Sequence, residues 1–325
     1  MTRKALLALA LATSLFAQKK DKKEEITQVL ELPKDPPFVT TAPSRRLLFH
    51  VSPLSTNGLL SQQTRDAVKS LQRLNGGAQF VHIRAFVAGN GDVRRVPQII
   101  SDVLTDKHQP VPSISVVRSG GLSLENSQVV LEAVSLAKKD TNPASIDFAE
   151  SGLVTAPEPG TPPRPLLEKA LDQLAAKSPK ALRVTCFVST MDPGLVGMVT
   201  AKFPGAAVNV VMTQRGPYQA LAACQSARQG TRPAEKLAFT GTRVAFGSQE
   251  KDAALAFQRL DKDLAEAGAT PDSIVFTNIY PLSGQMAELS LKVRKSKSPI
   301  AMIPSEGVAA VEAGFAVDAI AVAGN

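Results

Sequence analysis

Apolar and polar residues follow one another along this chain in an order of segments that occurs three times. Each time, a short strand pattern and a turn are followed by an amphipathic helix, a second strand, a second helix and a closing strand. The three stretches cover residues 44–138, 145–230 and 235–325. Such a repeat has to be recognised before single motifs, because missing it would misassign the whole fold. The pattern predicts an α+β fold of three β-β-α-β-α-β units.

The first helix of each unit has apolar residues at the spacing of one buried helix face. In the first unit these residues are Ala67, Leu71 and Leu74; the matching residues in the other two units are Leu167, Leu171, Leu174, Phe257, Leu260 and Leu264. The strand after this helix carries an aromatic residue at a matching place, namely Phe86, Phe187 and Tyr280. We therefore expect the three units to align residue by residue in this region.

A sheet with both helices on one face leaves its other face in need of a partner. Three units in one chain can bury these faces against one another around a pseudo-threefold axis, as the subunits of a cyclic trimer do. With 44% hydrophobic residues, the chain has enough apolar side chains for such a core. The sequence predicts a single-chain pseudo-trimer that is a monomer in solution.

The N-terminus has the layout of a secretory signal peptide, predicted here over residues 1–17. Arg3 and Lys4 precede an apolar run that is too short to span a bilayer, and a small residue, Ala17, ends the segment. A charged, proline-containing linker is expected over residues 18–43. No later apolar run is long enough for a transmembrane helix, so we predict a secreted or periplasmic protein without a membrane span.

Charge and cysteine content narrow the possible partners. The chain has 37 Lys and Arg against 29 Asp and Glu, and this excess is spread along its length without interleaved aromatic residues, so no nucleic-acid partner is expected. Cys186 and Cys224 lie in apolar stretches, where two buried thiols are favoured over the bridge that an oxidising compartment permits. No cluster has the spacing of metal ligands and no phosphate-binding loop occurs, so we predict neither metal nor cofactor.

Each unit resembles a domain of the RidA/YjgF family, also called the L-PSP endoribonuclease-like family, whose fold is chorismate-mutase-like. The resemblance depends on five segments: a helix opening (63–71), a strand (183–192), the segment KHQPVPSISVV (107–117), and the strand endings 131–135 and 317–323. No segment is a stringent signature by itself. Their order, given three times, is what makes the resemblance specific.

The resemblance implies a trimer with ligand clefts between neighbouring units. It also implies hydrolysis of reactive enamines or imines, such as 2-iminobutanoate and 2-iminopropanoate, to ketoacids and ammonia. In the family an Arg holds the substrate carboxylate in a bidentate pair, and a carboxylate on the last strand orders a water. On this basis the last-strand carboxylates Glu132 and Asp318 are candidate catalytic residues, whereas the second unit has Gln225 at that place.

The clamping Arg is missing from all three units. Pro112 stands at its place in the first unit, Ala207 or Val208 in the second and Ser298 in the third. Two other arginines, Arg118 and Arg215, lie in loops after the penultimate strands and are candidate substrate-binding residues, with solvated surface charge as the alternative. A displaced anion site would need one of them to point into a cleft.

The sequence leaves three alternative functions open for this chain. The first is an exported RidA-like protein without the clamp, which binds a small ligand between its units or serves as a scaffold. The second is a hydrolase of the enamine/imine deaminase type with altered specificity. The third, an RNA-processing protein, is suggested only by the older family name. Whether the chain is an enzyme is left open, because a shared fold does not fix a function.

Overall fold

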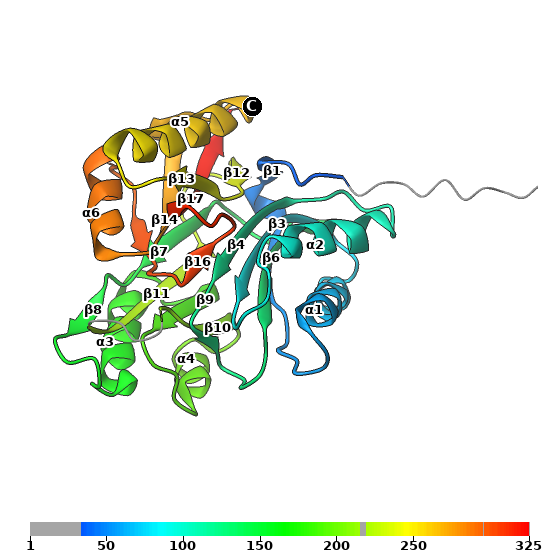
Figure 1. Ribbon diagram of the computed structural model, residues 1–325. Coiled ribbons are helices and arrows are strands. Elements are labelled where there is room, and N and C mark those ends of the chain that lie inside the picture. The colour runs from blue at the N-terminus through cyan, green and yellow to red at the C-terminus, as the bar shows by residue number, and fades with distance from the viewer. Residues whose placement is uncertain (1–33, 215–218, 295, 325) are drawn as a thin grey trace, which may run out of the picture. The chain divides into compact units, whose positions relative to one another are not determined.

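The computed structural model describes residues 34–214, 219–294 and 296–324, which fold into three mixed sheets with a helix pair on each (Figure 1). The first sheet is built from β2 (Leu47–Val51), β3 (Gln79–Val87), β4 (Ser113–Arg118) and β6 (Val129–Leu136), with helices α1 (Leu60–Leu74) and α2 (Arg95–Thr105). In the second sheet these places are taken by β7 (Ile146–Glu150), β8 (Val154–Ala156), β9 (Ala181–Val188), β10 (Ala207–Met212) and β11 (Ala220–Gln229), with α3 (Pro163–Lys177) and α4 (Leu195–Lys202).

The third sheet contains β12 (Lys236–Thr240), β13 (Arg243–Phe246), β14 (Ile274–Pro281), β15 (Ile300–Met302) and β17 (Ala313–Ala323), with α5 (Glu250–Glu266) and α6 (Gly284–Val293). Two short 3-10 helices are η1 (Ser44–Arg46) and η2 (Pro271–Ser273). In every sheet the middle strand, β3, β9 or β14, pairs in parallel with the strand after it and antiparallel with the closing strand. Each segment is therefore α+β, but its strands differ from the predicted order: β4, β10 or β15 precedes the closing strand after the second helix, and in the first segment only β2 precedes α1.

Each sheet also takes in one strand from another part of the chain. Strand β5 (Gly121–Leu122) pairs with β10 of the second sheet, and β16 (Gly307–Val308) pairs with β4 of the first. Strand β1 (Val39–Pro43) pairs with β12 of the third sheet. Residues 39–43, which the sequence analysis assigned to a linker, form strand β1. Residues 18–33 of that linker and the predicted signal peptide lie outside the described residues.

One apolar cluster lies between each of the three sheets and its own helices. The predicted inward faces of α3 and α5 are confirmed, since all six of their named apolar residues are buried. In α1, Ala67 and Leu71 are buried, but Leu74, the last residue of the helix, is 54% exposed. The local pattern thus predicted the covered faces except at one helix end.

A fourth apolar cluster collects residues from the inner faces of all three sheets. The three matched aromatic residues, Phe86, Phe187 and Tyr280, are buried in it. Phe86 and Phe187 contact each other edge to face, with their ring centroids 5.6 Å apart. The faces that the helices leave uncovered therefore bury one another, as the hydrophobic pattern requires.

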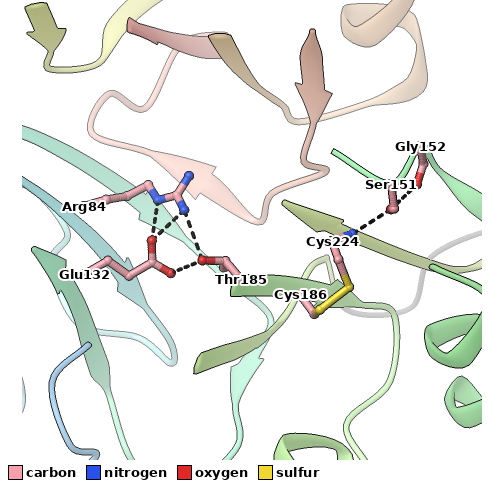
Figure 2. The surroundings of a disulfide bond; sticks show 7 residues. All are labelled: Arg84, Glu132, Ser151, Gly152, Thr185, Cys186 and Cys224. Atoms are coloured by element: carbon pink, nitrogen blue, oxygen red, sulfur yellow. Dashed lines mark hydrogen bonds and ion pairs between the residues drawn. A yellow bond between two sulfur atoms is a disulfide. The ribbon is translucent and has the colours of Figure 1, made fainter. Parts of the chain in front are cut away.

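Cys186 of β9 and Cys224 of β11 form a disulfide beneath α3 and α4 (Figure 2). The two residues are direct partners in the antiparallel register, with their Cα atoms 4.1 Å apart. The preference for two free thiols was therefore wrong. It failed because the cross-strand register, which places the two side chains against each other, is not visible in the separation of 38 residues along the chain.

Candidate functional site

Glu132 and Asp318, the predicted catalytic carboxylates, lie in the interior between the three sheets and not on an open wall. Their residues are 0% and 3% exposed. In the antiparallel registers Glu132 is paired with Arg84, Gln225 with Thr185, and Asp318 with Asn278. These six residues stand at the same place in their three sheets, and their side chains meet in one central polar network together with Asn209, Arg183 and Tyr280.

The carboxylate of Glu132 accepts hydrogen bonds from two sheets (Figure 2). Arg84 donates to Oε2 from Nε at 3.0 Å and from Nη2 at 2.6 Å. Thr185 Oγ1 and Asn209 Nδ2, both of the second sheet, donate to Oε1 at 2.7 Å each. No acceptor site of this carboxylate is left facing a cavity where a water could be activated.

The other edge of the Arg84 guanidinium faces Gln225 and Asn278. With the Gln225 amide oriented so that both of its polar atoms are satisfied, its oxygen accepts from Nη1 and Nη2 at 2.7 Å and its nitrogen donates to Asn278 Oδ1 at 2.9 Å. Asn278 Nδ2 in turn donates to Asp318 Oδ1 at 2.7 Å, and Tyr280 donates its hydroxyl to Oδ2 at 2.9 Å. One buried guanidinium thus connects side chains of all three sheets.

Arg183 is the second buried cation of the network. One of its Nη atoms lies 3.7 Å from Glu132 Oε2, and its guanidinium is 5.5 Å from the centroid of the Phe49 ring. Burial, together with the charge of Arg84, lowers the pKa of Arg183 to about 10 despite the attraction of Glu132. The cation is therefore retained at neutral pH.

The pKa values of the two carboxyl groups of the network are shifted in opposite directions. Burial would raise the pKa of Glu132, but the charges of Arg84 and Arg183 outweigh burial and lower the pKa to about 2. Burial raises the pKa of Asp318, because Arg84 and its hydrogen-bond donors offset only part of the desolvation. Burial also lowers the pKa of His82 to about 3, and His82 Nδ1 lies 3.1 Å from Ser113 Oγ.

The parallel registers show which residues stand at equivalent places in the three segments. Arg84, Thr185 and Asn278 are paired with Ser115, Asn209 and Ala301. Three residues before these partners stand Pro112, Ala206 and Ser298. Pro112 and Ser298, at which the family Arg was expected, are thus equivalent, and their equivalent in the second segment is Ala206, which precedes Ala207 and Val208. None of the three positions has a guanidinium.

The three junctions between neighbouring sheets differ in the space they leave. Between the first and second sheets, Glu132 and Asn209 are in direct contact. Between the third and first sheets, only about 20 Å³ remains beside Asp318, and a Cβ on Gly241 would come within 2.6 Å of the Ile114 carbonyl oxygen. Between the second and third sheets, a cleft of about 260 Å³ is open.

The open cleft lies between β7 and β11 on one side and β15 on the other. Its lining is largely apolar and contains no Lys, Arg or His; the residues are Glu150, Gly152, Leu153, Phe187, Ala223, Cys224, Gln225, Ile300, Ala301, Met302 and Ile303. Glu150 accepts a hydrogen bond from the Gly152 backbone N–H and lies 3.7 Å from Lys177. Gln225 closes its inner end, at the place where the other two sheets have carboxylates.

Arg118, one of the two predicted substrate-binding arginines, does not meet the carboxylates. Arg118, at the end of β4, donates from Nη2 to the Gly91 carbonyl oxygen at 2.9 Å, away from the network. Arg215 lies outside the described residues. Sequence reasoning missed Arg84 and Arg183, although each is a cation inside an otherwise apolar strand, and such a residue is almost never buried without a partner.

A larger cavity, about 1140 Å³, lies on loops of the first sheet beside residues 191–193. It contains none of the predicted site residues, and its charged residues are of both signs: Asp92, Arg95, Glu125 and Asp192. In the described part of the chain, no group of three acidic, His or Cys side chains is arranged to hold a metal ion, and no helix is long and apolar enough to cross a membrane.

Part of this chain is similar to several solved protein structures. No family model matches the chain, and neither does any curated protein. Rv2704 from Mycobacterium tuberculosis, a member of the YjgF/YER057c/UK114 family, is 21% identical over 26% of this chain and 78% of its own, with a TM-score of 0.24. NMB1025 from Neisseria meningitidis, a YjgF family member, is 19% identical over 27% of this chain and 81% of its own, with a TM-score of 0.25.

Yeast Mmf1 is also similar, with 19% identity over 27% of this chain and 80% of its own and a TM-score of 0.24. Each match covers about a quarter of the present chain. The solved structures that part of this chain resembles are members of the YjgF family, which is the family that its sequence resembles.

Proposed function

We propose that this protein is an exported, single-chain assembly of three RidA-like units that has lost the deamination chemistry and binds a small uncharged molecule in the cleft between its second and third sheets. The observation that carries this is the state of the last-strand carboxylates. Glu132 is fully buried and bound by Arg84, Thr185 and Asn209, so it cannot order a water for attack on a substrate.

Asp318 does not restore the activity. Both of its oxygens accept hydrogen bonds, from Asn278 and Tyr280, and the space beside it is about 20 Å³, room for a water molecule but not for an amino-acid-sized substrate. A general base must be within hydrogen-bond reach of the atom on which it acts. Deamination at this junction would therefore require the sheets to separate.

The chemistry of the open cleft favours an uncharged ligand. A carboxylate moved from water into it would meet apolar side chains and Glu150, with no cation in the lining to compensate its desolvation. Small-molecule sites are typically apolar hollows with a few polar groups that fix orientation. Gln225 and the backbone around Gly152 can supply those groups.

Loss of deamination is tested with freshly generated 2-aminoacrylate. Purified protein is expected to release ammonia no faster than buffer, because neither Glu132 nor Asp318 is open to a substrate. Release well above buffer would support the alternative hydrolase and refute the proposal.

The ligand class is tested with two probes of the same shape, benzyl alcohol and benzoate, titrated by calorimetry. Benzyl alcohol should bind saturably, and benzoate at least about tenfold more weakly. Ala223→Phe, which fills the cleft, should abolish binding of benzyl alcohol, whereas Ala201→Phe on the exposed side of α4 should not. Equal binding of both probes, or no effect of Ala223→Phe, would contradict this assignment.

Export and monomeric state belong to the same proposal. The signal-peptide pattern of residues 1–17 supports export, and so does the Cys186–Cys224 disulfide, because disulfides persist in oxidising compartments. Expression with the native N-terminus should give an extracytoplasmic protein that begins at Gln18, and light scattering should give the mass of one chain. A cytoplasmic, uncleaved product or a mass of three chains would contradict these two points.

A further inference from the structure

A pocket of about 350 Å³ lies at the ends of the two helices that cover the first sheet. It is lined by Lys69, Gln72 and Arg73 of α1, Gly77 in the turn after that helix, and Lys107 and Gln109 in the turn after α2. Three of its six residues are cations and none is acidic. We call this the basic pocket.

The three cations of the basic pocket have no carboxylate partner among the described residues, where no ion pair includes Lys69, Arg73 or Lys107. Asp106, next to Lys107 in sequence, does not line the pocket. Lys69 and Arg73 are also four residues apart on one helix face, a spacing at which like charges destabilise a helix. The pocket therefore has a positive charge that no described carboxylate within 4 Å offsets.

Cations are common at helix C-termini because they interact favourably with the helix dipole, so the corresponding helix ends of the other two sheets are the right comparison. Those ends also have lysines, and three of them have a carboxylate within 4 Å: the pairs are Lys177 with Glu150, Lys202 with Asp172, and Lys292 with Glu250. Among the described residues, Lys180 and Lys297 in the turns after these helices have no such pair. The helix dipole explains a cation at this place. It does not explain three cations without counter-ions.

A corresponding hollow of about 490 Å³ lies at the helix ends beside the third sheet. It contains the cations Lys292, Arg294 and Lys297. Two of these are neutralised there, Lys292 by Glu250 at 2.5 Å and Arg294 by Asp261 at 2.8 Å. Asp272 lines the same hollow. Only the pocket of the first sheet lacks carboxylates among the described hollows at this place.

A buried amide organises the basic pocket. Gln72 is 8% exposed; its Oε1 accepts a hydrogen bond from Lys107 Nζ at 3.0 Å, and its Nε2 donates to Gln109 Oε1 at 2.7 Å. The ammonium of Lys107 is thus held in place by a neutral group that leaves its charge available. The Gln109 amide nitrogen remains as a further donor, since only its oxygen is used by Gln72.

From this arrangement we propose that the basic pocket binds a tetrahedral oxyanion, the phosphate or sulfate group of a small ligand. Two ammonium groups, a guanidinium and an amide N–H₂ supply donors for several oxygens at once, and charge-assisted hydrogen bonds to such groups are the strong ones. The site is separate from the cleft of the second and third sheets and does not depend on the function proposed for it.

The test is calorimetric titration of the full mature chain with pyrophosphate and, separately, with inorganic sulfate, at an ionic strength of about 0.15 M so that weak surface attraction is screened. Pyrophosphate should bind at one site. The triple variant Lys69→Gln/Arg73→Gln/Lys107→Gln should lower its affinity at least about tenfold. The matched control is Lys177→Gln/Lys202→Gln/Lys292→Gln, which removes the same charge from the paired helix ends and should stay within about twofold of the parent.

Both variants change only surface residues, and thermal unfolding by circular dichroism checks that they fold. An equal loss of affinity in the two variants would overturn the site, because the binding would then follow net charge. Absence of saturable binding of either anion would overturn it as well. Retention of vesicles of phosphatidylglycerol or of single-stranded RNA, without pyrophosphate binding, would replace the small ligand by a membrane or a nucleic acid.

Discussion

Replacing Glu132 by Gln should remove a large part of the free energy of unfolding. The carboxylate is fully buried and accepts four hydrogen bonds, two from Arg84 and one each from Thr185 and Asn209. Gln keeps the shape but not the charge, and its amide nitrogen must face a group that itself donates. Arg84 and Arg183 would then be two buried cations with Asp318 as the nearest remaining acid.

The expected loss is about 3–5 kcal/mol, the usual consequence of removing one partner from a buried ion pair. The free energy of unfolding of a domain is only about 5–15 kcal/mol in total, so the variant should be only marginally stable. The interaction is also pH-dependent. Because folding lowers the pKa of Glu132 from 4.5 to about 2, its contribution is present above pH 4.5 and is lost as the pH falls toward 2.

The measurement is urea unfolding followed by circular dichroism, since the chain contains no Trp for fluorescence. Asp192→Asn is the matched control: it breaks an exposed pair in which Arg164 donates to both carboxylate oxygens, at 3.0 and 2.9 Å, and should lower the free energy of unfolding far less than Glu132→Gln. A second test is a double-mutant cycle of Glu132→Gln with Arg84→Met. The double variant should be more stable than the sum of the single effects by about 0.5–3 kcal/mol.

Equal destabilisation by Glu132→Gln and Asp192→Asn would refute the central role of the network. So would strictly additive effects in the cycle, because additivity is the behaviour of residues that do not interact. If Glu132→Gln does not fold, the Arg84→Met variant measured alone still has to show a loss well above that of the surface control.

Three further predictions concern other parts of the molecule. Burial lowers the pKa of His82 from 6.5 to about 3, so below pH 6.5 the unfolded chain binds a proton that the folded chain does not. The free energy of unfolding should therefore fall by up to about 1.4 kcal/mol per pH unit below pH 6.5. His82→Gln should flatten this slope, and an unchanged slope would contradict the prediction. Gly241→Ala should lower the free energy of unfolding in urea by about 1–3 kcal/mol, because its Cβ overpacks the junction of the third and first sheets. Gly197→Ala in α4, where a Cβ meets no other atom, should raise the free energy of unfolding. The reverse order of stabilities would show that this junction is loosely packed. Replacing Cys186 and Cys224 by Ala should lower stability by roughly 2–4 kcal/mol, and thiol labelling of the unfolded parent should find free thiols only after reduction.

Much of the fold could be predicted from local patterns. The 3.6-residue spacing of Leu167, Leu171 and Leu174 predicted the buried face of α3, and the apolar runs predicted β3, β9 and β14 within a few residues. These predictions succeed because a helix or strand has a fixed period, so the residues that share a face follow from sequence spacing alone. Leu74, the last residue of α1, has the same spacing and is nevertheless exposed.

The candidate site could be predicted only in part. Glu132 and Asp318 were found from their places on the closing strands, and the absence of a clamping Arg was visible in the residue types. The partners were not found, because Arg84 is 48 residues from Glu132, and Thr185 is 53 residues from it. Which inward-facing residues meet depends on how three sheets pack, and no local period contains that information.

The sequence by itself determined most of the helices and strands and most of the faces that they bury. Only the tertiary structure decided where the remaining polar groups go: Glu132 and Asp318 into a network around Arg84, and Cys186 against Cys224. It also decided that one junction leaves a cleft while Gly241 closes another. The physical reason is that hydrophobic burial specifies a face, whereas register and packing between distant strands specify which side chains on that face come into contact.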